Sequence, residues 1–228
     1  MPTDAPPLAV DIDGTLTDEH RSVDPRTFPV LRAWPSPVVV ATGKAMPYPV
    51  ALCEFLGIEP VVIAENGGVA LVGQAGTLEF QGNPETVAAA GDAYRERGHS
   101  FGWGPVDIVN RWRETELAVS REMPLAPLEE VAADHGLVVV DTGFAYHLKS
   151  PDFDKGTGLV TVCDAMDIDP SSVVAVGDSD NDVPAFEVAG TSIAVANAAE
   201  AAQERADHVT DTSYAAGFLE AIEWLCRP

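Results

Sequence analysis

Basic residues, cysteines and long apolar runs are scarce in this chain of 228 residues. The three cysteines, Cys53, Cys163 and Cys226, are far apart in the sequence. This spacing favours a reducing compartment, and it argues against both a disulfide framework and a thiolate metal site. No apolar run is long enough to span a bilayer, and residues 1–4 lack the charged and apolar regions of a signal peptide. We therefore expect a cytoplasmic protein with no membrane partner.

Positive charge is scarce relative to negative charge. Lys and Arg number 13 and Asp and Glu 36, which gives a formal net charge of −23. The acidic residues are spread along the chain, so the protein repels nucleic acid and anionic lipid, and we expect neither as a partner. An ordinary acidic protein and a halophilic one remain alternative interpretations, of which we favour the second. Only Lys44, Lys149 and Lys155 are lysines, which makes their positions informative.

Apolar residues are plentiful, at 46% of the chain, which is enough for a buried core. Short runs rich in Val and Ile, at residues 37–41 and 60–64, alternate with helix patterns in the first half. Such runs are typical of strands in a parallel sheet that helices cover on both faces. The same rhythm returns from Lys155 onward, with strands expected at 172–176 and 191–195.

The middle of the chain follows another pattern. Residues 65–68 predict a turn with positive φ, and residues 68–82 predict a hairpin. We then expect a helix followed by two strands, twice over: a helix at 84–97, alternating strand within 107–120, a helix at 125–135 and two strands around 141–143. This is a compact α+β unit of its own. The predicted organisation is a discontinuous core of residues 1–80 and 152–228 with an inserted domain at 81–151.

Polar groups occur where several of the expected strands end. These groups are Asp11 and Asp13, then Thr42-Gly43-Lys44, then Lys155 at a helix start, and finally the run 177–182 (GDSDND). Each alone has an ordinary interpretation as a turn, a helix cap, a solvated charge or an acidic loop. Because ligands of an open parallel sheet bind outside the carboxyl ends of its strands, their joint occurrence favours one functional site.

These residues resemble the four motifs of the haloacid dehalogenase-like (HAD) superfamily. The matching segments are Asp11-Ile12-Asp13-Gly14-Thr15, Thr42, Lys155 and Gly177–Asp182. The insertion lies between the second and third motifs, where the C2-type caps of the family occur. The resemblance implies an α/β fold, with a Rossmann-like parallel-sheet core and an inserted small α+β cap domain. The small cap and the turn at 65–68 further resemble the archaeal phosphoglycolate phosphatase branch of the Cof-like group.

The resemblance implies a phosphatase that works through an aspartyl-phosphate intermediate. Asp11 is the expected nucleophile, since a carboxylate nucleophile splits phosphoester hydrolysis into two easier steps. Asp13 is the expected general acid and base, which protonates the departing alkoxide and then deprotonates a water. It must hold a proton at neutral pH, and we expect a crowd of carboxylates around it to favour that form. The family's ATP-driven pumps carry threonine at this position, so aspartate favours rapid hydrolysis.

The same motifs imply phosphate and metal binding. Lys155, the Thr42 hydroxyl and backbone N–H groups near Gly43 are expected to bind phosphate oxygens. The expected metal ligands are the side chains of Asp11, Asp178 and Asp182 and the backbone carbonyl of Asp13. Because all of these are hard oxygen ligands, the expected cofactor is Mg²⁺.

The expected cap contributes further candidates for substrate contact, namely Arg111, Arg113, His147 and Lys149. The two arginines would project from one face of a strand spanning residues 107–120. They could bind a substrate carboxylate, or they could form surface ion pairs with Glu114 or Glu116, and both interpretations stay open.

The expected partner is a small-molecule phosphate ester. We favour 2-phosphoglycolate because chain length and cap pattern resemble that branch. Sucrose-phosphate and mannosyl-3-phosphoglycerate phosphatases share all four motifs but usually carry larger caps. A phosphomutase and a non-catalytic phosphate-binding protein are further alternatives, and the latter is disfavoured because binding alone needs no nucleophile beside an acid. We expect a monomer or a homodimer.

Overall fold

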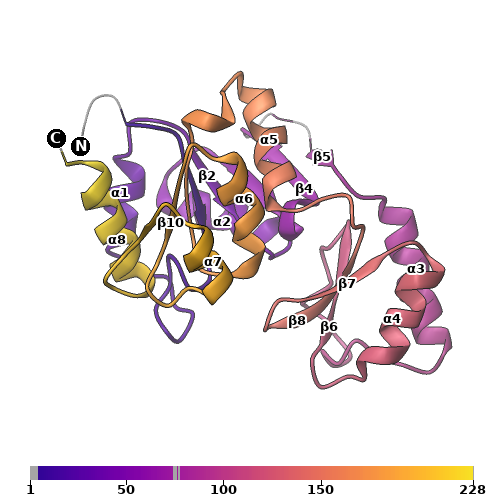
Figure 1. The fold of residues 1–228 in the computed structure, drawn as a ribbon. Helices are drawn as coiled ribbons and strands as arrows, with labels where there is room; N and C mark the ends of the chain where they lie inside the picture. The colour runs from indigo at the N-terminus through magenta and orange to yellow at the C-terminus, as the bar shows by residue number, and fades with distance from the viewer. Residues whose placement is uncertain (1–4, 74–75, 77, 228) are drawn as a thin grey trace.

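A computed structural model of the protein describes residues 5–73, 76 and 78–227. Residues 1–4, which entered the signal-peptide prediction, lie outside this part. The chain forms a larger α/β unit and a smaller unit that carries α3, α4 and β6 to β8 (Figure 1). Among the described residues, no helix combines the length and apolar character needed to cross a membrane.

The larger unit contains an eight-stranded sheet in the order β11-β10-β9-β1-β2-β3-β4-β5. Strand β4 pairs antiparallel with both of its neighbours, β3 and β5, and all the other pairs are parallel. The bounds are β1 (Leu8–Asp11), β2 (Val38–Ala41), β3 (Val61–Ala64), β4 (Val69–Val72), β5 (Leu78–Phe80), β9 (Val174–Gly177), β10 (Thr191–Ala194) and β11 (His208–Val209). The central strand β1 lies between β2 and β9, so both halves of the chain build the middle of the sheet.

Helices cover both faces of this sheet because successive side chains of each strand point to opposite faces. Leu8 and Val10 of β1 pack in one apolar cluster with Phe218, whereas Ala9 packs in another with Leu159. The first cluster includes residues of α1 (Thr27–Arg32), α2 (Pro47–Leu56) and α8 (Tyr214–Leu225). The second includes residues of α5 (Lys155–Met166), α6 (Val183–Val188) and α7 (Glu200–Arg205).

The smaller unit is a three-stranded antiparallel sheet in the order β6-β8-β7. Its elements are α3 (Pro84–Glu96), β6 (Glu116–Ser120), α4 (Leu125–Asp134), β7 (Val138–Asp141) and β8 (Ala145–Lys149). An apolar cluster that includes Val87, Val119, Leu128 and Leu148 joins the two helices to the sheet. The helices lie on the side away from the larger unit (Figure 1).

Most expected elements of this middle region are confirmed. The helices at 84–97 and 125–135 correspond to α3 and α4, and the two strands around 141–143 are β7 and β8. The turn at 65–68 has positive φ at three successive residues, Glu65, Asn66 and Gly67. The hairpin at 68–82 is formed by β4 and β5, although its residues 74, 75 and 77 lie outside the described part.

The strand expected over 107–120 is wrong in its first part, because β6 begins only at Glu116. Asp107 has a φ of 41°, and its carboxylate accepts hydrogen bonds from the backbone and side chain of Asn110. Such local side-chain bonds compete with strand pairing and fold the chain into turns. Among the described residues, α3 and α4 are therefore separated by one strand instead of two, and Arg111 and Arg113 share no strand face.

Candidate active site

The residues of the four motifs meet at the carboxyl edge of the large sheet. Asp11 is the last residue of β1, Thr42 follows β2, and Asp178 follows β9. Lys155 is the first residue of α5, whose N-terminus is capped by the Asp154 carboxylate. Because β2, β1 and β9 are neighbours in the sheet, these ends are adjacent in space.

The ammonium of Lys155 lies between two buried carboxylates. Its Nζ donates to Oδ1 of Asp11 at 2.7 Å and to Oδ1 of Asp182 at 2.6 Å. Burial by itself lowers the pKa of Lys155, but the two carboxylates outweigh it and raise that pKa above its usual value. Lys155 therefore stays charged and offsets part of the negative charge at the sheet edge.

Asp11, Asp178 and Asp182 form a cluster in which one oxygen of each carboxylate lies within 4.8 Å of the others. Burial, with added repulsion from Asp182, raises the pKa of Asp11 to about 7 despite the nearby Lys155. Burial, followed by repulsion from Asp11 and Asp182, raises the pKa of Asp178 to about 8. The cluster is thus short of positive charge and offers only oxygen donors, a set that fits a hard divalent cation.

Two glycines allow the loops of this cluster to approach closely. A Cβ atom on Gly177 would lie 2.4 Å from Cγ of Asp182, and one on Gly14 would lie 2.0 Å from Oδ2 of Asp178. Gly14 also has a φ of 89°, which disfavours other residues. The second oxygen of Asp182 accepts the N–H groups of Asp178 at 2.9 Å and Ser179 at 3.0 Å, which orients its carboxylate.

Asp13 has cations as its hydrogen-bond partners. Its Oδ2 accepts from Nζ of Lys44 at 2.5 Å and its Oδ1 from Nε of Arg21 at 3.2 Å. Asp13 is not a member of the cluster of Asp11, Asp178 and Asp182, although its charge acts on Asp11. Sequence reasoning missed Arg21, whose only signal was its position shortly after the first motif in a chain with few basic residues.

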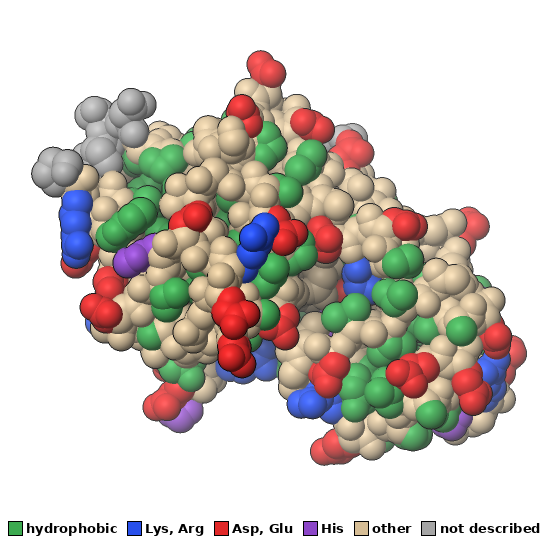
Figure 2. Space-filling model, viewed as in Figure 1, with side chains coloured by type: hydrophobic (Ala, Val, Ile, Leu, Met, Phe, Trp, Pro, Cys, Tyr) green, Lys and Arg blue, Asp and Glu red, His purple; other side chains and the backbone are tan. Residues whose placement is uncertain are grey.

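A cavity of about 450 Å³ opens at this edge, between the larger and the smaller unit. Figure 2 shows the molecule hollowed along the junction of the two units. The larger unit contributes residues that include Asp11, Asp13, Arg21, Thr42, Gly43, Lys44, Asn66 and Asp178, and the smaller unit contributes Arg113, Thr142, Gly143, Phe144 and His147. A bound molecule here would contact both units.

Arg113 and Arg111 have different surroundings. The Arg113 side chain is only 4% exposed, forms an ion pair with Glu116 and donates from Nη2 to the Gly43 carbonyl at 2.9 Å. The ion-pair interpretation is thus correct for Arg113, but the pair is buried instead of lying at the surface. Arg111 is exposed in the preceding turn and is not among the described residues that line the cavity.

Glu116 is the centre of a buried polar network that sequence reasoning did not foresee. Its Oε1 lies 3.0 Å from Nδ1 of His147, and its Oε2 accepts from Nδ2 of Asn66 at 2.8 Å. Asn66 in turn accepts from Asn181 at 2.9 Å, which connects the network to the loop after β9. Burial opposes ionisation of Glu116, but His147 and Arg113 lower its pKa to about 2, so it is a carboxylate.

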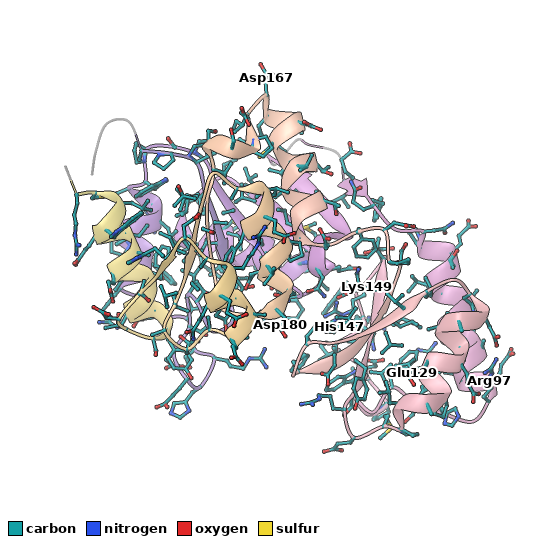
Figure 3. The ribbon with its side chains drawn as sticks, in the orientation of Figure 1. Arg97, Glu129, His147, Lys149, Asp167 and Asp180 are labelled. Carbon is teal, nitrogen blue, oxygen red and sulfur yellow. The ribbon has the colours of Figure 1, made fainter. Side chains whose placement is uncertain are left out.

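His147 and Lys149 both lie on β8, on the side of the smaller unit that faces the larger one (Figure 3). His147 is buried and lines the cavity. The ammonium of Lys149 is held by the backbone carbonyls of Ser150 and Phe153, where the chain returns to the larger unit. Lys149 therefore braces this connection.

The fold and this site together define a class of protein. A family model described as haloacid dehalogenase-like hydrolase matches residues 8–102 and 128–222, and the chain belongs to this family. The predicted resemblance and the predicted fold class are confirmed.

Individual relatives match over nearly the full length. A Haloarcula marismortui protein named phosphoglycolate phosphatase is 60% identical over 97% of this chain and 98% of its own length. A protein of the same name from Natronomonas pharaonis is 57% identical, over 95% and 96%. A solved structure from Thermoplasma acidophilum has a TM-score of 0.83 at 24% identity and covers 97% of this chain and 98% of its own, which supports the fold alone.

Proposed function

We propose that this protein is a phosphatase that hydrolyses 2-phosphoglycolate to glycolate and phosphate. The observation that carries the proposal is the position of Asp11, a buried carboxylate at the end of β1 that contacts Lys155 and opens to the cavity. The choice of substrate is supported by the relatives named phosphoglycolate phosphatase at 60% and 57% identity.

In the proposed reaction, an oxygen of Asp11 attacks phosphorus and forms an aspartyl phosphate while the bond from phosphorus to the glycolate oxygen breaks. Asp13 donates a proton to the departing alkoxide. It then accepts a proton from the water that hydrolyses the aspartyl phosphate and releases inorganic phosphate. Lys44 and Arg21 hold the Asp13 side chain in place for both transfers, the first from its protonated form and the second to its carboxylate.

Binding of the phosphoryl group is assigned to Lys155, to the Thr42 hydroxyl and to backbone N–H groups near Gly43. Thr42 and Gly43 line the cavity, and the Thr42 hydroxyl already accepts the Lys44 N–H at 3.1 Å, which orients it. A preformed set of donors stabilises negative charge on the transferring group with little reorganisation.

The proposed cofactor is Mg²⁺, which the side chains of Asp11, Asp178 and Asp182 and the backbone carbonyl of Asp13 would hold. When bound, it supplies positive charge that reduces repulsion between the nucleophile and the phosphate. The convergence of three carboxylates within 4.8 Å supports this assignment.

Residues 81–151 are proposed to act as the cap domain, which covers the cavity and excludes water during transfer. Arg113 is the arginine that this arrangement favours for a contribution to substrate binding, since it lines the cavity while Arg111 is exposed. We further propose a cytoplasmic monomer or homodimer, in keeping with the three scattered cysteines.

The test is phosphate release from a panel of esters in high KCl with Mg²⁺. The panel contains 2-phosphoglycolate, hexose phosphates, sucrose 6-phosphate and mannosyl-3-phosphoglycerate, and Asp11→Asn serves as the matched control. We expect the highest kcat/KM with 2-phosphoglycolate and loss of turnover in the variant. A preference for a sugar phosphate would overturn the substrate, and turnover by Asp11→Asn would overturn the mechanism.

A further inference from the structure

Five side chains that can carry positive charge lie at the cavity or directly beneath it, and they differ in how many of their donors are occupied. They are Arg21, Lys44, Arg113, His147 and Lys155. The chain as a whole carries a net charge of −23, so this concentration of basic groups creates a local site for an anion.

Four of the five are already held by the protein. Lys155 bridges two carboxylates, and Lys44 and Arg21 both bind Asp13. Arg113 is fixed at three points, since it pairs with Glu116 and donates to the carbonyls of Gly43 and Val109. These three contacts fix the orientation of the planar guanidinium group of Arg113.

His147 is the exception. Its side chain is buried, at 2% exposure for the residue, and its Nδ1 is held by Glu116 at 3.0 Å. The other ring nitrogen, Nε2, makes no hydrogen bond to any described residue, although His147 lines the cavity. Because Nε2 lies on the side of the ring away from Nδ1, the contact with Glu116 leaves Nε2 directed away from that carboxylate.

The charge of this cluster suits an anion. Glu116 contributes one negative charge and Arg113 one positive charge, and the ring of His147 is a group that can carry a second positive charge. Imidazolium donates from both nitrogens, so one N–H can bind Glu116 while the other remains available to a ligand. Asn66, which donates to Glu116, extends this network. A Cβ atom on Gly43 would lie only 2.8 Å from Oδ1 of Asn66, so the cluster adjoins the loop assigned to phosphate binding.

We propose that Nε2 of His147 binds the carboxylate of the substrate while the strand ends bind its phosphate, and that Glu116 holds the imidazole for this contact. The inference rests on the proposed function and defines its substrate class as short phosphorylated carboxylic acids. An ester without the carboxylate leaves the buried imidazole without its second partner, so it binds less well.

Two substitutions of His147 separate the nitrogens. The amide nitrogen of Asn can replace Nδ1 and keep the Glu116 contact, whereas the amide nitrogen of Gln can replace Nε2. The substrates are 2-phosphoglycolate and ethyl phosphate, in which a methyl group replaces the carboxylate. For His147→Asn we expect kcat/KM with 2-phosphoglycolate to fall about 10- to 100-fold, mostly through KM, as for loss of a charged hydrogen bond. We expect a much smaller change with ethyl phosphate, and partial retention of the preference in His147→Gln.

The outcomes separate this inference from the proposed function. If His147→Asn loses the same factor with both esters, His147 has a structural role and the inference is wrong, while the proposed phosphatase activity stands. If the wild-type protein fails to prefer 2-phosphoglycolate over ethyl phosphate, the proposed substrate itself is wrong.

A spectroscopic measurement keeps His147 unchanged and so avoids any folding defect of the variants. The chain has five histidines, and the ¹⁵N signals of the His147 ring can be assigned by their loss in either variant. In Asp11→Asn with Mg²⁺, addition of 2-phosphoglycolate should shift the His147 Nε2 resonance, and ethyl phosphate should leave it in place. An unchanged Nε2 resonance at saturating 2-phosphoglycolate would overturn the inference.

Discussion

The ammonium of Lys44 lies 2.5 Å from Oδ2 of Asp13 and ties the loop after β2 to the loop after β1. With Arg21 on the other oxygen, it leaves the proposed general acid and base little freedom to rotate. The orientation of Asp13 thus depends on basic residues that lie outside the matched motif positions.

Substitution of Lys44 by Met should therefore impair proton transfer to the leaving group. We expect kcat for 2-phosphoglycolate to fall about tenfold or more, up to the full contribution of general acid catalysis, which is about 10²- to 10⁴-fold. Turnover of p-nitrophenyl phosphate should fall less, because p-nitrophenolate departs without a proton. Lys44→Arg, which keeps a cation, is the control. Equal losses with both esters would show that Lys44 acts on binding and not on proton transfer.

The buried side chain of Glu65 should make the stability of the folded protein depend on pH. Its carboxylate is buried and accepts hydrogen bonds from the backbone of Glu114 and Thr115 and from the Thr115 hydroxyl, which ties the larger unit to the smaller. Burial, with repulsion from Glu116, raises the pKa of Glu65 to about 7. The folded state thus holds a proton that the unfolded state has lost, so this group lowers stability as pH rises from about 4.5 to about 7.

Replacement of Glu65 by Gln removes that titration. Above about pH 7 we expect Glu65→Gln to unfold at higher urea concentration than wild type, by on the order of 2 kcal/mol in the free energy of unfolding. Near pH 4.5 the difference should vanish. The measurement is urea unfolding of both proteins across this range at constant salt, and a difference that is independent of pH would contradict the assignment.

The carboxylate cluster predicts how metal binding depends on pH. Because the pKa of Asp11 is raised to about 7 and that of Asp178 to about 8, protons compete with a divalent cation at low pH. The increase in Tm on addition of Mg²⁺ should therefore grow between about pH 6 and about pH 8.5, and EDTA should abolish it. Thermal unfolding of wild type and Asp178→Asn tests this, and an equal increase in the variant would exclude Asp178 as a ligand.

Lys155→Met should affect both stability and activity. Loss of one partner of a buried ion pair typically costs about 3–5 kcal/mol, and here two carboxylates lose their cation. We expect a loss of that order without metal, partial recovery with Mg²⁺, and no measurable turnover. The control is Arg205→Met, which breaks the exposed pair with Glu187 and should cost less than about 1 kcal/mol. Similar costs for the two variants would contradict the buried network.

The fold and the motif residues could be predicted because local signals carry them. The run of Val and Ile in β2 and β3 identifies parallel strands, and a polar residue directly after such a strand must lie at its carboxyl edge. Likewise, Asn83 before Pro84 predicts the start of α3, where its side chain accepts two N–H groups.

Most partners of the site residues could not be predicted, because they depend on long-range packing. The pair of Arg113 with Glu116 was foreseen as one interpretation, since the two residues are three apart, but nothing local indicates that this pair is buried with His147 or that Lys44 reaches Asp13. The strand expected over 107–120 was wrong because its alternating pattern ignores the side-chain bonds between Asp107 and Asn110.

The position of β1 between β2 and β9 also determines when the active site can form during synthesis. Strand β1, which carries Asp11, emerges from the ribosome early. Its second edge pairs with β9, which ends only at Gly177. The smaller unit, whose contacts are local, can fold while the larger sheet is still open along β1. Until β9 is synthesised, the apolar edge of β1 on that side has no partner strand. We therefore expect the nascent chain to need protection from aggregation during this interval.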